Sequence, residues 1–86
     1  MNFYNFMTRH HINDAGPVGR LAKDMQSDRE RFPKNGQGKF AGWKAIIRRY
    51  LEGQEASDNC LWAFDEAWEE YVRCEKKRLN QNLPLR

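Results

Sequence analysis

The densest group of chemically capable side chains lies in the string Phe-Asp-Glu-Ala-Trp-Glu-Glu-Tyr, residues 64–71. Its four carboxylates belong to Asp65, Glu66, Glu69 and Glu70, a residue type that serves acid–base catalysis or holds a divalent cation. No third ligand and no nucleophile stands at a diagnostic spacing from them. The pattern therefore favours a solvated acidic face over a catalytic or metal site.

The histidines and cysteines are poorly placed for metal or nucleophilic chemistry. His10 and His11 are adjacent, so on a helix they point in different directions, and we expect a capping or turn role. Cys60 and Cys74, if they share a helix, are separated by about 21 Å of rise, whereas a disulfide needs Cα atoms within about 7 Å. We therefore expect reduced, buried cysteines, a cytoplasmic protein, and neither a metal nor a cofactor.

The segment Gly36-Gln37-Gly38-Lys39 has a faint likeness to a phosphate-binding loop. It lacks the first glycine, the spacing and the Lys-Ser/Thr pair of that motif, and no strand precedes it. We expect a flexible loop. With 86 residues, the chain also has too few polar side chains to line a pocket of several hundred Å³, so we do not expect an enzyme.

The basic residues are the one set suited to contacting a partner, although the formal net charge is only +3. Residues 36–53 carry four bases and one acid, residues 54–75 one base and seven acids, and residues 76–86 four bases and no acid. The candidate binding surface consists of Lys39, Lys44, Arg48, Arg49, Lys76, Lys77 and Arg78. Ordinary surface charge, balanced by the acidic segment, is the competing interpretation.

The elements that must position these side chains are all helices. Apolar spacing predicts helices over residues 3–10, 17 to 29 or 30, 40–52 and 58–79, and no segment shows strand alternation. Gly42 weakens the start of the third helix, Gly53 is placed to cap its end, and Ser57 or Asp58 is placed to cap the fourth. We predict an all-α, compact bundle of four to five helices over residues 1–79, followed by a flexible basic tail, residues 80–86.

The aromatic side chains are expected in the core of this bundle. In the third helix the apolar stripe is Phe40, Trp43, Ile46, Ile47, Tyr50 and Leu51. In the fourth, Phe64, Trp68 and Tyr71 fall on one face. No apolar run approaches the roughly 20 residues needed to cross a bilayer, and the first residues do not resemble a signal peptide.

Four strings of residues, taken in order, resemble the YozE family. They are Phe-Tyr-Asn-Phe-Met at residues 3–7, Phe-Pro at 32–33, Tyr-Leu at 50–51 and the acidic aromatic string at 64–71. The resemblance covers roughly residues 3–72 and implies a sterile-alpha-motif-like (SAM-like) bundle. It implies no catalytic residues. The loop at residues 36–42 looks longer than the family pattern, and the chain after Val72 looks like an addition.

Two functions remain open at this level. The first is a small non-enzymatic interaction module that binds a protein partner or itself through segregated basic and acidic surfaces. The alternative is a nucleic-acid-binding accessory protein that uses the basic third helix and tail. We expect no membrane partner and no small-molecule substrate. A basic face with the acidic residues on the opposite side favours nucleic acid, whereas a basic and an acidic patch of matching shape favour protein association.

Overall fold

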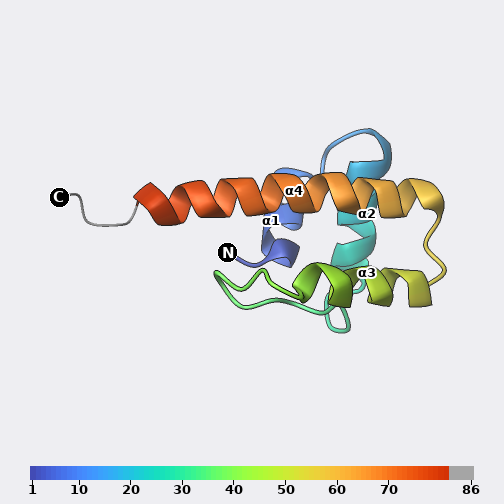
Figure 1. The fold of residues 1–86 in the computed structure, drawn as a ribbon. Helices are drawn as coiled ribbons and strands as arrows, with labels where there is room; N and C mark the ends of the chain where they lie inside the picture. The colour runs from blue at the N-terminus through green and yellow to red at the C-terminus, as the bar shows by residue number, and fades with distance from the viewer. Residues whose placement is uncertain (82–86) are drawn as a thin grey trace.

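A computed structural model describes residues 1–81, and their side chains as far as Leu79, and within this part the regular secondary structure consists of four α-helices joined by turns and loops (Figure 1). The helices are α1 (Phe3–His10), α2 (Gly16–Ser27), α3 (Trp43–Gly53) and α4 (Asp58–Gln81). The all-α prediction is confirmed, and within the described residues the fifth helix is absent. The last helix continues two residues past its predicted end at residue 79, and residues 82–86 of the predicted tail lie outside the described part.

The long helix α4 organises the bundle. It contacts α1, α2 and α3, whereas α3 packs chiefly on α4 (Figure 1). Figure 1 also shows the last turns of α4 extending past the other helices, as expected from its polar final third.

Local hydrogen bonds explain where the helices begin. The Asn2 side chain accepts a hydrogen bond from the Asn5 amide and caps α1. Of the two predicted caps for α4, Ser57 is the correct one, because its hydroxyl accepts a bond of 3.2 Å from the Cys60 amide. Gly42 precedes α3 at a φ of 79°, and this helix begins at Trp43 and not at Phe40, in agreement with the weakening effect predicted for Gly42.

The end of α2 differs from the prediction. The helix ends at Ser27, two to three residues early, and the Asp28 carbonyl then accepts bonds from the Arg31 and Phe32 amides. This turn carries Phe32 into the core, where it is 4% exposed. Burial of a large aromatic side chain thus ends the helix before Pro33 can interrupt it.

The end of α3 corrects the prediction for Gly53, which lies inside the helix. The chain leaves α3 through a Schellman motif, in which the Ala56 amide bonds to the Leu51 carbonyl and the Glu55 amide to the Glu52 carbonyl. The left-handed position that usually holds glycine is occupied by Glu55, at a φ of 60°. The sequence signal failed because the glycine stands two residues before the position that needs it.

Replacing Glu55 with glycine is expected to raise the free energy of unfolding by about 1 kcal/mol, since a side chain with Cβ is disfavoured in the left-handed region. Urea denaturation followed by circular dichroism measures the change. Glu55→Ala is the matched variant, because it removes the carboxylate but keeps Cβ. If Glu55→Ala stabilises the protein as much as Glu55→Gly, charge rather than backbone conformation accounts for the effect.

The core is dominated by aromatic side chains from α1 and α4. Phe3 is fully buried, and its ring lies 5.6 Å from Phe64 and 5.5 Å from Tyr71 in edge-to-face arrangements. The remaining core side chains come from all four helices and the turn after α2: Phe6, Met7, Leu21, Ala22, Met25, Phe32, Ile47, Leu51, Ala63, Ala67 and Trp68. The predicted aromatic face of α4 is confirmed.

Some apolar residues lie outside this core. Ile46, predicted to be buried, is 47% exposed, because α3 packs on one neighbouring helix and buries only a narrow stripe that contains Ile47 and Leu51. Trp62 on α4 is 55% exposed. The cysteines differ from the prediction in part, since Cys60 is half-buried but Cys74 is exposed. The core therefore leaves large apolar side chains on the surface.

Candidate functional site

The candidate basic and acidic surfaces are joined where α3 lies along α4. Arg48 Nη1 donates to both carboxylate oxygens of Asp65, at 3.1 and 3.2 Å, and Arg48 Nε lies 3.3 Å from Glu52. Lys44 Nζ lies 3.7 Å from Glu69 Oε2 and 3.9 Å from Asp65 Oδ1. Two of the three basic residues of α3, Lys44 and Arg48, therefore face carboxylates of α4, whereas Arg49 has no such partner among the described residues.

The other candidates divide into paired and unpaired groups. Glu70 accepts from the His11 ring at 2.9 Å, and Arg78 lies 3.3 Å from the buried Glu75. Within the described part of the chain, the candidates with no ion-pair partner are Lys39, Arg49, Lys76, Lys77 and Glu66. Exposed ion pairs contribute little stability, but a paired cation is less available to an anionic partner.

Lys39 and Lys76, far apart in the sequence, line one groove between the loop before α3 and the second half of α4. The groove has a volume of about 610 Å³, and Phe40, Trp43, Trp68 and Val72 form its apolar surface. An adjoining hollow along α4 brings in Lys44, Glu69 and Arg73. We call the two together the Trp68 groove. Its rim carries four cationic side chains and one carboxylate.

A buried polar network holds the Lys39 side of the groove. Asn35, 2% exposed, accepts a hydrogen bond of 2.9 Å from the Phe3 amide and donates to the Lys39 carbonyl at 2.9 Å. It also donates to the Tyr71 hydroxyl, which in turn donates to the Met1 carbonyl. The amino group of Met1 lies 2.7 Å from Glu75 Oε1. The loop that sequence reasoning treated as flexible is thus fixed to α1 and α4.

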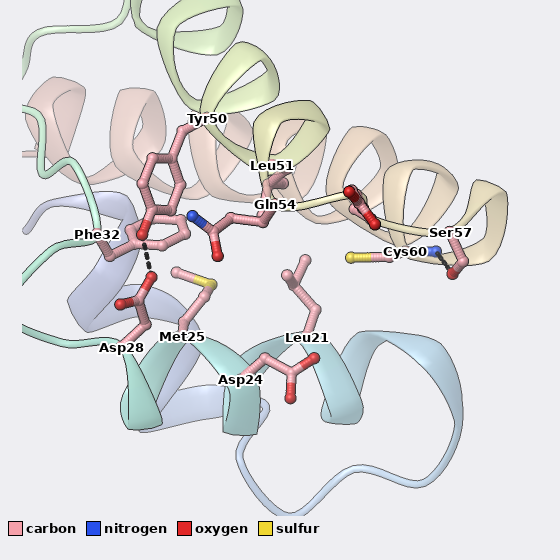
Figure 2. A pocket seen from close by; sticks show the side chains of 12 residues that line it. Leu21, Asp24, Met25, Asp28, Phe32, Tyr50, Leu51, Gln54, Ser57 and Cys60 are labelled. Carbon is pink, nitrogen blue, oxygen red and sulfur yellow. Dashed lines mark hydrogen bonds between the residues drawn. The ribbon is translucent and has the colours of Figure 1, made fainter.

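A cavity of about 380 Å³ lies between α2, the end of α3 and the start of α4 (Figure 2). Figure 2 shows Leu21 and Met25 rising from α2, Tyr50 and Leu51 descending from α3, and the Cys60 sulfur pointing into the space between them. From the sequence we expected no pocket of this size, and that expectation is wrong. Helices that diverge around the residue 54–57 turn leave the space open.

The charged side chains that line this cavity, Asp24, Asp28 and Glu55, are all acidic. The Tyr50 hydroxyl donates to the Asp28 carboxylate, which raises the pKa of Tyr50. Burial, together with the nearby charge of Asp24, raises the pKa of the Cys60 thiol. Cys60 is therefore held in its neutral form at neutral pH and is a poor nucleophile there.

His11 is a structural link in this fold. It is the C-cap of α1, and its ring bridges Asp14 in the following turn and Glu70 on α4.

Within residues 1–81 no group of three His, Cys, Asp or Glu side chains lies close enough to hold a metal ion. None of the four described helices is long and apolar enough to span a membrane.

Sequence reasoning identified the basic candidates but missed the residues that arrange them. Trp68 is buried as predicted, at 4% exposed, and it also lines the groove, whereas Trp43, predicted to lie in the core, is only partly buried. No role was predicted for Asn35. No spacing rule connects residue 35 with residues 3 and 71, so the network has no local signal in the sequence.

The comparisons with known proteins agree with this fold. A family model described as the YozE SAM-like fold matches residues 2–73. A UPF0346 protein of Streptococcus pyogenes is 38% identical over 72 residues, which are 83% of this chain and 80% of the relative. No solved structure matches the chain. The matched region ends before Lys76, Lys77 and Arg78. Because the family model covers most of the chain and this relative is 38% identical, the chain belongs to the YozE SAM-like family.

Proposed function

We propose that the protein is a small non-enzymatic interaction module, which binds an acidic, aromatic-bearing protein segment in the Trp68 groove. The observation that carries the proposal is the excess of cations around an apolar floor. Lys39, Arg73 and Lys76 line the groove with no ion-pair partner among the described residues, whereas its one carboxylate, Glu69, pairs with the fourth cation, Lys44. Charge complementarity selects an acidic partner, and the partly buried side chains of Phe40, Trp43 and Val72 supply contact area for an apolar anchor.

The placement of the acidic residues supports a protein partner over a nucleic acid. Asp65 and Glu69 lie within 4 Å of Lys44, and Asp65 also pairs with Arg48. The acidic side chains are therefore beside the basic ones and not on an opposite face. An extended phosphate backbone following α3 would meet these carboxylates, whereas a short acidic segment needs only the groove.

A second copy of the chain carries a segment with the required chemistry. Trp62 is 55% exposed on α4, and the exposed carboxylates of Asp58 and Glu66 stand one helical turn to either side of it. We call these three residues the Trp62 knob. The knob of one copy is complementary in charge and apolar character to the Trp68 groove of another. Because knob and groove are different surfaces, their contact is head-to-tail.

Sedimentation velocity of the purified protein tests this directly. We expect association at about 20 mM salt that weakens strongly at about 500 mM salt, because the contact is electrostatic. Lys39→Glu with Lys76→Glu disables the groove, and Trp62→Ala disables the knob, so each variant alone is expected to be monomeric. Mixing them is expected to restore a one-to-one dimer, since each supplies the surface that the other lacks.

The matched control is Lys23→Glu with Arg29→Glu, which changes the charge equally at exposed positions outside the groove. This variant is expected to associate like the parent protein.

An acidic peptide, acetyl-Glu-Glu-Phe-Glu-Glu-amide, tests partners other than a second copy through the fluorescence of Trp43 and Trp68. A parent protein that stays monomeric at low salt and does not bind this peptide contradicts the proposal.

A mobility-shift experiment separates the alternative function. On the protein-binding proposal, a duplex DNA or RNA probe at low ionic strength is not shifted, or is shifted equally by the parent protein and the Lys39→Glu, Lys76→Glu variant. A shift that the variant abolishes, in a protein that neither self-associates nor binds the acidic peptide, assigns the groove to nucleic acid instead.

A further inference from the structure

We propose that the cavity between α2, the end of α3 and the start of α4 binds a small organic cation, an ammonium or guanidinium group carried on an apolar body. This site is separate from the Trp68 groove: the two share no lining residue. The proposal therefore does not depend on the proposed function, and either can fail alone.

The size and floor of the cavity suit the apolar part of such a ligand. Its volume of about 380 Å³ falls in the range of small-molecule pockets, which are commonly about 300–1,000 Å³. The floor is formed by Leu21, Met25, Phe32 and Leu51, each no more than 7% exposed. A hydrocarbon or aromatic body seated there removes apolar surface from water on both partners.

The charges around the cavity determine the sign of the ligand. Three of its lining residues are acidic, Asp24, Asp28 and Glu55, and none of the lining residues is Lys, Arg or His. This local excess of negative charge contrasts with the chain as a whole, whose formal net charge is +3. None of the three carboxylates has an ion-pair partner among the described residues. Arg20 lines the adjoining hollow with Asp24, and the charge of Arg31 acts on Tyr50, so three carboxylates stand against two cations outside the lining. The remaining negative excess favours a cation over an anion.

The arrangement of these groups favours an organic cation over a metal ion. The carboxylates stand around an apolar floor and are not gathered at one point, and within residues 1–81 no three acidic, histidine or cysteine side chains could coordinate one ion. Tyr50 and Phe32, whose ring centroids are 5.6 Å apart, also line the cavity. Aromatic faces attract organic cations, so carboxylates and rings select the same class of ligand.

The Tyr50 hydroxyl fixes the polar side of the site. It donates a hydrogen bond to the Asp28 carboxylate. This bond joins the end of α3 to the end of α2 and orients the Asp28 carboxylate beside the cavity. Figure 2 shows the Gln54 side chain extending into the same region. Its amide oxygen is an acceptor suited to an ammonium or guanidinium N–H.

Titration with three related compounds tests the proposal by nuclear magnetic resonance. Phenethylammonium supplies the cation, 2-phenylethanol is its neutral counterpart, and 3-phenylpropanoate is the anion. We expect saturable shifts at Met25, Tyr50, Gln54 and Cys60 with the cation, about tenfold weaker binding of the alcohol, and no binding of the anion. Equal affinity for the cation and the alcohol, or shifts centred outside the cavity, overturns the proposal.

A pair of isosteric variants shows whether the local carboxylates are responsible. Asp24→Asn with Glu55→Gln is expected to reduce cation affinity to that of the alcohol while leaving alcohol binding unchanged. Glu30→Gln with Glu52→Gln removes the same charge from exposed positions that line neither the cavity nor the Trp68 groove and lie outside the Trp62 knob, and it is expected to bind the cation as the parent does. If both double variants lose the same cation affinity, the net charge of the protein explains the effect, and the assignment of the site is overturned.

Discussion

Replacing Asn35 with alanine is expected to lower the free energy of unfolding by about 4 kcal/mol. The side chain is 2% exposed and bonds to the Phe3 amide, the Lys39 carbonyl and the Tyr71 hydroxyl. Alanine leaves these buried groups without a partner, and each buried unsatisfied group costs about 1–3 kcal/mol. Because a domain of this size is stable by only about 4–13 kcal/mol, the loss is a large fraction of the total.

Urea denaturation followed by circular dichroism measures this change. Asn59→Ala is the matched control, since Asn59 is exposed on α4, and its effect is expected to stay within about 0.5 kcal/mol. Tyr71→Phe removes the hydroxyl alone and is expected to cost less than Asn35→Ala. A loss below about 1 kcal/mol for Asn35→Ala would show that water replaces its three bonds. Asn35→Ala should also weaken binding in the Trp68 groove, because the Asn35 side chain donates a hydrogen bond to the Lys39 carbonyl.

Replacing Gly19 with alanine is expected to destabilise the fold by at least about 3 kcal/mol. Gly19 lies in α2, and a Cβ atom built on it would stand 1.8 Å from the Asp14 carbonyl oxygen and 2.6 Å from the Asp14 carbonyl carbon. Both atoms belong to the backbone, so the clash cannot be relieved by a side-chain rotation. The turn after α1 must move, and it carries His11, which bridges Asp14 and Glu70.

The helix propensity of alanine makes this prediction a sharp one. In an open helical position, alanine is more stable than glycine by about 0.5–1 kcal/mol. Gly53 provides that control, because it lies in the last turn of α3 and a Cβ atom added to it would have nothing within 4 Å. Opposite signs for Gly19→Ala and Gly53→Ala are therefore expected in the same thermal or urea measurement. If Gly19→Ala and Gly53→Ala both stabilise the protein, the close contact between Gly19 and the Asp14 backbone is refuted.

Patterns within single helices were the part of the fold that could be read correctly. The face of Phe64, Trp68 and Tyr71 is buried as predicted, because helical periodicity is a local property of the chain. Helix ends were less accurate. The end of α2 is set by the burial of Phe32, and the end of α3 by a glutamate where glycine is usual.

The candidate binding residues show the same division. Their identity came from composition, since Lys39, Lys44, Arg48 and Lys76 were evident as a basic excess. Which of them are neutralised was not evident, because Asp65 and Glu69, which pair with Lys44 and Arg48, lie on another helix. The cavity beside Tyr50 was missed altogether, since it exists only where three helices fail to fill the space between them.

By itself, the sequence determined that this chain is a helical bundle with an aromatic core, that it resembles the YozE family, and that its charges alternate in blocks. These properties follow from residue type and from spacing along one helix. Only the tertiary structure decided that Lys39 and Lys76 share a groove and that carboxylates surround a cavity of about 380 Å³. Contacts between residues distant in sequence depend on how the helices pack, and helix packing leaves no fixed spacing in the chain.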